Sequence, residues 1–219
     1  MSPGKGSVNR GLKEAEKKGY DTVFFEPGIH TVKGDYVVID REMKICGAGR
    51  DRTIVKGGGF KIKGKKKEGK NVVLLKDMTI SETKYKGVYG KNGLSWLCDS
   101  MTITQCGDCG VAARNTKGRL INCVITQCGH SGVNCYENAL IGLEGDQTKV
   151  NGNVTGGDSG STYGLETSDT SSIIHLLFPL TKESVSTNNG GGGNYGGDGT
   201  IETVNSKYNW WQLYIKNNN

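Results

Sequence analysis

The sequence predicts an all-β solenoid, a single parallel β-helix with about 22 to 23 residues per coil, on two main observations. The first is a repeat, in which MTIS (78–81), MTITQCG (101–107) and VITQCG (124–129) are each followed by a Gly-Val pair. The glycines of these pairs, Gly87, Gly110 and Gly132, are spaced at 23 and 22 residues, a period typical of stacked coils. The second is composition, because 35 glycines and only 7% aromatic residues favour many short strands over long helices.

Stacking places equivalent residues of successive coils in ladders, and alternation along each strand points every second side chain inward. The expected inward ladders are Ile80 with Ile103 and Ile125, Val88 with Val111 and Val133, Cys106 with Cys128, and Met101 with Cys123. Residues 23–25, 37–39, 43–45 and 54–55 supply earlier and less regular coils. Length divided by the period, after allowance for ends and loops, predicts roughly seven coils.

The two ends of the single domain, 1–219, are expected to be caps. Residues 1–19 predict a short amphipathic helix, with Ser7 as its N-cap, Gly19 at its end, and Val8, Leu12 and Ala15 on one face. Such a helix covers the open core of the first coil. Coils fill 20–187, and 188–219 predicts a Gly-rich loop (188–199), a last strand (201–204) and a closing segment that contains Trp210 and Trp211.

The charge of the chain is concentrated in one segment, 56–70. It holds seven lysines and one glutamate, which equals the net charge of +6 for the whole chain. We expect an insertion that enlarges one coil, and either a solvated loop or a contact for a polyanion. The polyanion candidates are Lys61, Lys63, Lys65, Lys66 and Lys67.

Other sequence features exclude several classes of protein. No apolar stretch is long enough for a membrane span, and 1–10 has no apolar core of a signal peptide. Seven cysteines are an odd number, which favours free buried thiols in a reducing compartment over a disulfide framework. We expect no cofactor, and the sequence leaves the compartment and oligomeric state open.

Several motifs together resemble the right-handed parallel β-helix, or pectin-lyase-like, superfamily over about two-thirds of the chain. The opening helix followed by DTVFFEPGIH (21–30) is similar to the start of many such proteins. MKICGAG (43–49) with TIVKG (53–57) resembles a motif of pectin methylesterases, and the Thr-Ile coils resemble repeats of carbohydrate-binding and sugar-hydrolysing members. The resemblance implies a right-handed, glycan-associated fold. The paired aspartates of the esterases, the clustered acids of pectate lyases and the Asp-Pro site of epimerases are not found in this sequence.

The coil offsets also align side chains on the outward face of the strands that follow the Gly-Val pairs. One row holds Tyr89, Ala112 and Asn134, and a second holds Lys91, Arg114 and Tyr136. If 164–165 begins the next coil, Glu166 and Ser168 join them. Aromatic faces stack on sugars and a guanidinium matches a carboxylate, so this patch is a candidate ligand-binding surface. The alternative is an ordinary solvated sheet face.

One turn carries more chemistry, because the same offset puts Asp108 beside His130. The pair is a candidate general base, with Arg114 and Glu166 as further catalytic candidates. Alternatively, Cys106, Cys109, Cys128 and His130 form a zinc site, since Cys-x-x-Cys is a common ligand spacing. The third interpretation, which we favour, is that the thiols face the core and the polar pair lies on the surface.

The sequence therefore favours a glycan-binding module, with acidic polysaccharide or another polyanion as partner and nucleic acid a weaker candidate. Two other classes stay open. One is a polysaccharide lyase, epimerase or esterase that acts on uronate polymers, and the other is a solenoid scaffold that binds a protein.

Overall fold

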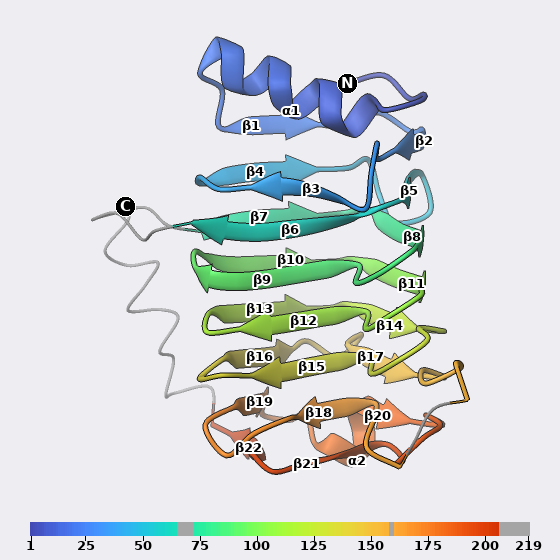
Figure 1. Ribbon diagram of the computed structural model, residues 1–219, viewed down its shortest axis with the longest axis vertical. Coiled ribbons are helices and arrows are strands. Elements are labelled where there is room, and N and C mark those ends of the chain that lie inside the picture. Colours follow the sequence, from blue (N-terminus) through green and yellow to red (C-terminus); the bar gives the residue numbers. More distant parts are fainter. Residues whose placement is uncertain (65–71, 158–159, 206–219) are drawn as a thin grey trace.

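The computed structural model describes residues 1–64, 72–157 and 160–205, and these form a three-sided parallel β-helix (Figure 1). Sheet 1 runs in the order β1 (Thr22–Phe24), β4 (Met43–Cys46), β7 (Val72–Lys76), β10 (Ser95–Asp99), β13 (Lys117–Ile121), β16 (Leu140–Glu144), β19 (Ile173–Leu177) and β22 (Thr200–Val204). Sheet 2 runs β2 (Gly28–Thr31), β5 (Thr53–Gly57), β8 (Thr79–Thr83), β11 (Thr102–Cys106), β14 (Val124–Thr126), β17 (Lys149–Asn151) and β20 (Ser186–Thr187). Sheet 3 runs β3 (Tyr36–Ile39), β6 (Gly59–Gly64), β9 (Val88–Gly93), β12 (Val111–Arg114), β15 (Val133–Tyr136), β18 (Leu165–Thr167) and β21 (Tyr195–Gly197).

Each described strand pairs in parallel with the strand three places along the chain, so every three strands make one coil. The chain passes leftward through sheet 3 at the front, returns through sheet 1 behind and descends through sheet 2, which is right-handed winding (Figure 1). This confirms the predicted all-β, right-handed solenoid of about seven coils.

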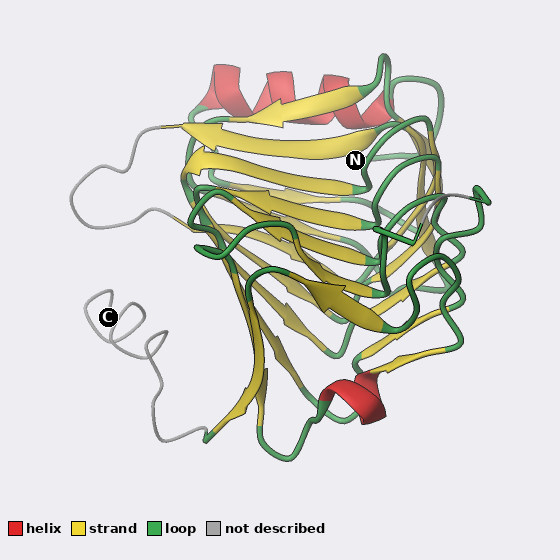
Figure 2. Ribbon diagram, turned by 60° about the horizontal axis from the view of Figure 1, so that its bottom comes forward, coloured by secondary structure: helices red, strands yellow, loops and turns green. Residues whose placement is uncertain are grey.

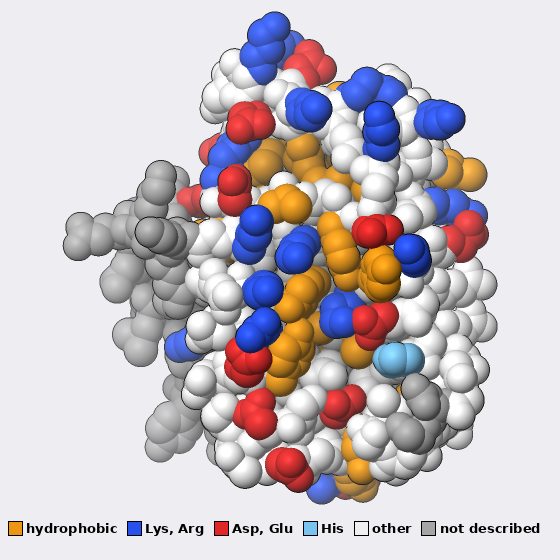
Figure 3. All heavy atoms as spheres, viewed as in Figure 1, with side chains coloured by type: hydrophobic (Ala, Val, Ile, Leu, Met, Phe, Trp, Pro, Cys, Tyr) orange, Lys and Arg blue, Asp and Glu red, His pale blue; other side chains and the backbone are white. Residues whose placement is uncertain are grey.

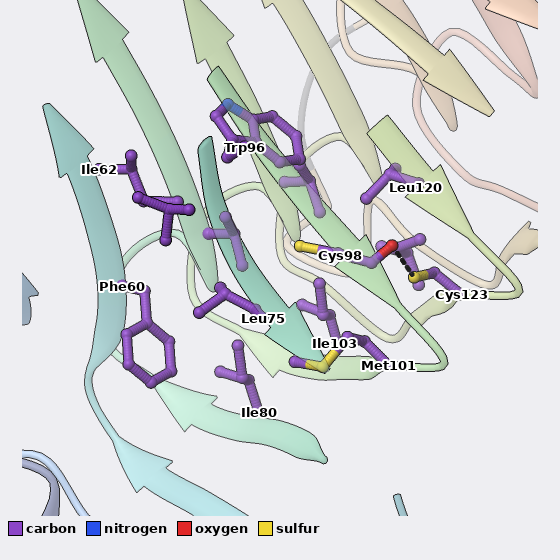
Figure 4. Packing of buried hydrophobic residues seen from close by; sticks show 14 of the residues in the cluster. Phe60, Ile62, Leu75, Ile80, Trp96, Cys98, Met101, Ile103, Leu120 and Cys123 are labelled. Atoms are coloured by element: carbon purple, nitrogen blue, oxygen red, sulfur yellow. Dashed lines mark hydrogen bonds between the residues drawn. The ribbon is translucent and has the colours of Figure 1, made fainter. Parts of the chain in front are cut away.

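The predicted ladders have the expected register. Ile103 pairs with Ile80 and Ile125, and Val111 pairs with Val88 and Val133. All these side chains are fully buried in one continuous core that extends through the coils (Figure 4). Stacking therefore supplies what no single coil has, a closed apolar interior.

The Gly-Val repeat has a packing cause at its glycine. A Cβ added to Gly110 would lie 2.4 Å from Cγ2 of Ile125 and 2.9 Å from the carbonyl oxygen of Gly132. Gly87 is equally crowded by Ile103. The strand of sheet 3 starts so close to the neighbouring coil that only glycine fits.

Trp96 is the largest fully buried side chain, and two more glycines make room for it (Figure 4). A Cβ on Gly118, the residue paired with Trp96 in sheet 1, would lie 2.0 Å from Cζ2 of the indole. A Cβ on Gly90 in β9 would lie 2.0 Å from the indole Nε1. The indole thus occupies space that the two missing side chains leave in the core.

The helix α1 (Ser7–Lys18) lies across the N-terminal end of the solenoid, as predicted (Figure 2). Val8 and Ala15 are buried beneath it, and Gly19 ends it in a left-handed conformation. The predicted N-cap was wrong, because Gly6 holds that position and Ser7 is the first helical residue. The Ser7 hydroxyl instead lies 3.1 Å from Nδ1 of the buried His30, so it ties the helix to the first coil.

Two other expectations need correction. Residues 56–64 are not part of a loop insertion, because they form the end of β5 and all of β6. These strands pair with β8 and β9, with a register shift between Lys56 and Gly57 and another between Lys63 and Gly64. The Gly-rich segment 188–199 is not entirely loop, since it contributes β21. The last strand exists as β22, and a short helix, α2 (Lys182–Val185), precedes β20. Lys65, Lys66, Lys67 and the closing segment with Trp210 and Trp211 lie outside the described residues.

Candidate functional site

The outward face of sheet 3 carries two rows of side chains that the coil register places one above another. The first row holds Val38, Lys61, Tyr89, Ala112, Asn134 and Glu166. The second holds Lys63, Lys91, Arg114 and Tyr136. The predicted ligand-binding residues thus do share one face, and two lysines of the segment 56–70, Lys61 and Lys63, join them.

Tyrosines and lysines alternate at the N-terminal half of this face. The ammonium of Lys61 lies 5.8 Å from the ring centre of Tyr36 and 5.5 Å from that of Tyr89. Tyr36 in turn stacks on Tyr85, with ring centres 6.3 Å apart. Lys86 lies 5.6 Å from the Tyr89 ring on the other side. Basic and hydrophobic side chains accordingly gather over the middle of this face (Figure 3).

Tyr136 and Tyr89 bridge two coils, because the Tyr136 hydroxyl donates to the Tyr89 hydroxyl at 3.0 Å. They meet across β12, where Ala112 is fully buried although it occupies an outward position. Burial raises the pKa of Tyr136 above its usual value, and the hydrogen bond to Tyr89 raises it further. The Tyr136 ring therefore stays neutral at physiological pH.

The second row is less uniform in charge. The Arg114 Nε donates to Glu137 Oε2 at 2.6 Å, and both side chains are partly exposed. Lys63 is exposed and Lys91 half-exposed. Because the Arg114 contact is at the surface, an incoming anion can compete with Glu137 for the guanidinium.

A pocket of about 260 Å³ opens where this face meets the turn before it. Successive coils contribute aligned turn residues to it, since His130 N donates to the Asp108 carbonyl and Gly110 N donates to the Ser131 carbonyl. Its lining is mostly polar and consists of Lys86, Asp108, Cys109, His130, Ser131, Asn134, Tyr136, Thr162, Glu166 and Ser168. A second hollow of about 280 Å³ lies between α1 and β3 and contains none of these groups.

Asp108 is held by three neighbours within the pocket. Its carboxylate forms an ion pair with Lys86, accepts a hydrogen bond from Cys109 N at 2.6 Å, and lies 3.5 Å from Nδ1 of His130. Burial raises the pKa of this carboxyl, but Lys86 and the Cys109 amide outweigh burial and hold the pKa below its usual value. Burial likewise lowers the pKa of Lys86, and Asp108 more than reverses this. The predicted His130–Asp108 pair is therefore present, with Lys86 as its third member.

Glu166 lines the opposite side of the pocket and is 8% exposed. Its two carboxylate oxygens accept hydrogen bonds from different hydroxyls, Ser131 on one and Ser168 on the other, the latter at 2.6 Å. Ser168 also contacts Asn134 Oδ1 at 3.0 Å. Among the described residues no lysine or arginine forms an ion pair with Glu166.

The cysteines mostly face the core. All seven are free, and Cys106, Cys123 and Cys128 are buried as expected. Within the described part of the chain no cluster of three or more His, Cys, Asp and Glu side chains could hold a metal ion, so Cys106, Cys109, Cys128 and His130 do not converge. Cys109 is buried beside Asp108, whereas the Cys106 thiol donates weakly to the Thr104 carbonyl and the Cys128 thiol to the Thr126 carbonyl.

Sequence reasoning missed Lys86, Ser131 and Tyr36 at this site. The signal for two of them was available, because Lys86, Cys109 and Ser131 follow one another at offsets of 23 and 22 residues. Tyr36 lies in an earlier coil of irregular length, where the offset no longer predicts alignment. In the described ranges no helix has the length and apolarity required to span a membrane.

No protein-family model and no curated protein matches the chain. Among solved structures, the A-module of mannuronan C-5 epimerase AlgE6 from Azotobacter vinelandii is 12% identical, with 91% of this chain and 94% of that chain covered and a TM-score of 0.28. The A-module of AlgE4 from the same organism is 11% identical, with coverage of 91% and 93% and a TM-score of 0.25. Likeness at this level supports no inference about activity. The strand pairing, the three sheets and the handedness show that the chain is a right-handed parallel β-helix.

Proposed function

We propose that the outward face of sheet 3 binds an acidic polysaccharide. The observation that carries the proposal is the position of Lys61 between the rings of Tyr36 and Tyr89, in register with Lys63 and Lys91. Cations that alternate with aromatic rings offer a polymer of acidic sugars both of the contacts it needs. The rings pack against the apolar faces of the sugars, and the ammonium groups pair with their carboxylates or sulfates.

The rigidity of the platform supports the same proposal. Each of these side chains stands on a strand that is hydrogen-bonded to the coil above and the coil below, so little ordering is required on binding. From β6 to β18 the face spans four coil steps of about 4.8 Å, or about 19 Å, which gives room for several sugar units. Tyr36 contributes a neutral ring, because burial raises the pKa of its hydroxyl.

The first prediction removes the cations from this face. Replacing Lys61, Lys63 and Lys91 together by glutamine should weaken binding of polygalacturonate at low salt by about tenfold or more, a loss of about 1.4 kcal/mol. The loss should shrink as salt is raised, since these cations are at the surface. Isothermal titration calorimetry over a salt series measures both effects. The matched control replaces three exposed lysines outside the face, Lys17, Lys33 and Lys44.

The outcomes of that experiment distinguish a specific polysaccharide site from a general polyanion surface and from a protein scaffold. Equal losses in the two triple variants would reduce the interaction to net charge and would contradict a specific site. Binding of single-stranded DNA as tight as that of polygalacturonate would point to a general polyanion surface. No binding to uronate or sulfated polymers at low salt, with capture of a purified protein partner on this face, would favour a scaffold.

The pocket favours a second candidate function, catalysis on a uronate polymer. His130, aligned by Asp108, and Lys86 lie beside Tyr136 in an open pocket, an arrangement suited to removing a proton next to a sugar carboxylate. In a lyase, that proton leaves C5 as the oxygen on C4 departs, and a C4–C5 double bond forms. Ultraviolet absorbance of unsaturated uronate tests this directly. Activity that disappears in His130→Ala and in Asp108→Asn while binding persists would establish an enzyme.

A further inference from the structure

Charge is distributed unevenly along the proposed binding face. Its N-terminal half carries Lys61, Lys63 and Lys91 with the Arg114–Glu137 pair. The pocket lies along its C-terminal part, and the pocket lining contains one lysine, Lys86 from the turn before β9, against the two carboxylates of Asp108 and Glu166. A polymer that lies along the face therefore meets positive charge at one end and net negative charge at the other.

Glu166 is the source of this excess. Asp108 is neutralised by Lys86, whereas Glu166 is held by two serine hydroxyls that bring no charge. A carboxylate has about four acceptor positions, so about two remain for a ligand. Because Glu166 is more than nine-tenths buried and lines the pocket, its negative charge acts there with little screening by solvent.

The chemistry of this carboxylate discriminates between sugars. A second carboxylate brought into the pocket would be repelled, since two like charges at close range cost free energy. The hydroxyl pair of an uncharged sugar would instead donate to Glu166, as Ser131 and Ser168 already do. Asn134 beside it offers both a donor and an acceptor, and Tyr136 offers a ring to pack on.

We propose that this pocket is a subsite for an uncharged sugar unit, so that the ligand is a mixed polysaccharide in which neutral and acidic units alternate. This inference rests on the proposed binding function and narrows its substrate class. The acidic units lie over Lys61, Lys63 and Lys91, and a neutral unit enters the pocket about two or three coil steps away. Glu166 is the residue that weakens the binding of a polymer of acidic units only.

The test compares two probes of equal length by calorimetry, a hyaluronan hexasaccharide, in which uronate and N-acetylhexosamine alternate, and a hexagalacturonate. Wild-type protein should bind the alternating probe more tightly, although it carries fewer charges. Glu166→Gln should strengthen binding of hexagalacturonate by about tenfold and weaken that of the alternating probe, and so reverse the preference. The control is Asp51→Asn, which removes an exposed carboxylate that lies outside this face and its pocket and should leave the preference unchanged.

A second variant guards against loss of folding in Glu166→Gln. Asn134→Asp adds a second carboxylate beside Glu166 in the pocket and should weaken hexagalacturonate binding below that of the wild-type protein. If wild-type protein binds both probes and neither variant alters their ratio, the subsite is refuted while the acidic-polysaccharide function stands. If wild-type protein binds neither probe, both the subsite and the proposed acidic-polysaccharide function are refuted.

Discussion

At the scale of single residues, burial changes the chemistry of the thiols. Cys123 and Cys135 are fully buried, and burial raises the pKa of each to about 12. Cys123 also donates weakly to the Cys98 carbonyl at 3.4 Å (Figure 4). The same burial raises the pKa of Cys109. In the folded protein these sulfurs are therefore small apolar groups of the core and poor nucleophiles.

This burial predicts a stability that falls at alkaline pH. In the unfolded chain a thiol titrates near pH 8.5, whereas Cys123 and Cys135 keep their protons up to about pH 12 in the folded state. Above pH 8.5 the unfolded state therefore binds fewer protons, and the free energy of unfolding should fall by about 1.4 kcal/mol per pH unit for each such thiol. Urea unfolding between pH 7 and 10.5 measures the slope.

Substitution separates the contribution of one thiol from the rest. Cys123→Ala should make the slope shallower by about one thiol's share, while Cys46→Ala, at a half-exposed site, should change it less. Identical slopes in all three proteins would contradict the assignment. After denaturation without reductant, seven thiols should react with a thiol reagent, and any smaller number would reveal a disulfide.

At the scale of elements, the residues at the ends of each strand depend on the space that the neighbouring coil leaves and on the backbone conformation of the turn. Gln105, near the end of β11, and Gln127, directly after β14, have the same left-handed conformation in successive coils, with φ of 53° and 56°. Gly110 and Gly118 are fixed by close approach rather than by backbone conformation, because the next coil or the Trp96 ring fills the space of a side chain. The register between neighbouring coils is therefore fixed by residues at the strand ends as well as by the stacked apolar side chains.

The Trp96 contact gives a prediction for one element, β13. Gly118→Ala places a Cβ 2.0 Å from Cζ2 of the indole, far inside van der Waals contact, so the ring or the strand must move. Overpacking of this kind costs about 1–3 kcal/mol of the free energy of unfolding. Urea titration followed by tryptophan fluorescence measures the loss. Gly160→Ala is the matched control, since nothing lies within 4 Å of its added Cβ, and equal midpoints for the two variants would count against the packing argument.

At the scale of the whole molecule, a solenoid is vulnerable where stacking stops. The first coil would present the edges of β1 and β2 and an open core, and α1 covers these with Val8 and Ala15. Gly4 forms a parallel backbone bridge with His30, and the Ser7 hydroxyl contacts the imidazole of the same residue. The cap is thus attached by backbone, polar and apolar contacts together.

Loosening this cap should expose the edges. Val8→Asp buries a carboxylate without a partner and should lower the free energy of unfolding by about 3 kcal/mol. The uncovered strands should then associate between molecules as concentration rises. Thermal unfolding and light scattering after size exclusion measure the two effects. Lys17→Asp, at an exposed position of the same helix, should do neither, and a monomeric Val8→Asp protein of unchanged stability would refute the cap.

The sequence alone was enough to predict the solenoid, its period and the inward and outward sides of its central coils. It could do so because a constant offset of 22 to 23 residues places Ile80, Ile103 and Ile125 in one ladder without knowledge of any distant contact. The same offset paired Asp108 with His130 and aligned Tyr89 with Asn134. Wherever the coils have a regular length, the period of the sequence was sufficient to predict which residues align.

The positions where that regularity is interrupted, and the side chains that meet there, depend on how the chain folds in three dimensions. Between Gly132 and Gly164 the chain takes 32 residues instead of 22, so the contact of Glu166 with Ser131 depends on how the longer coil closes. Likewise, the lysines of 56–64 proved to lie on strands, because the register of β6 with β9 overrides their polar composition. The binding face and its pocket arise from side chains of several coils, and their contacts are fixed by packing that no local pattern records.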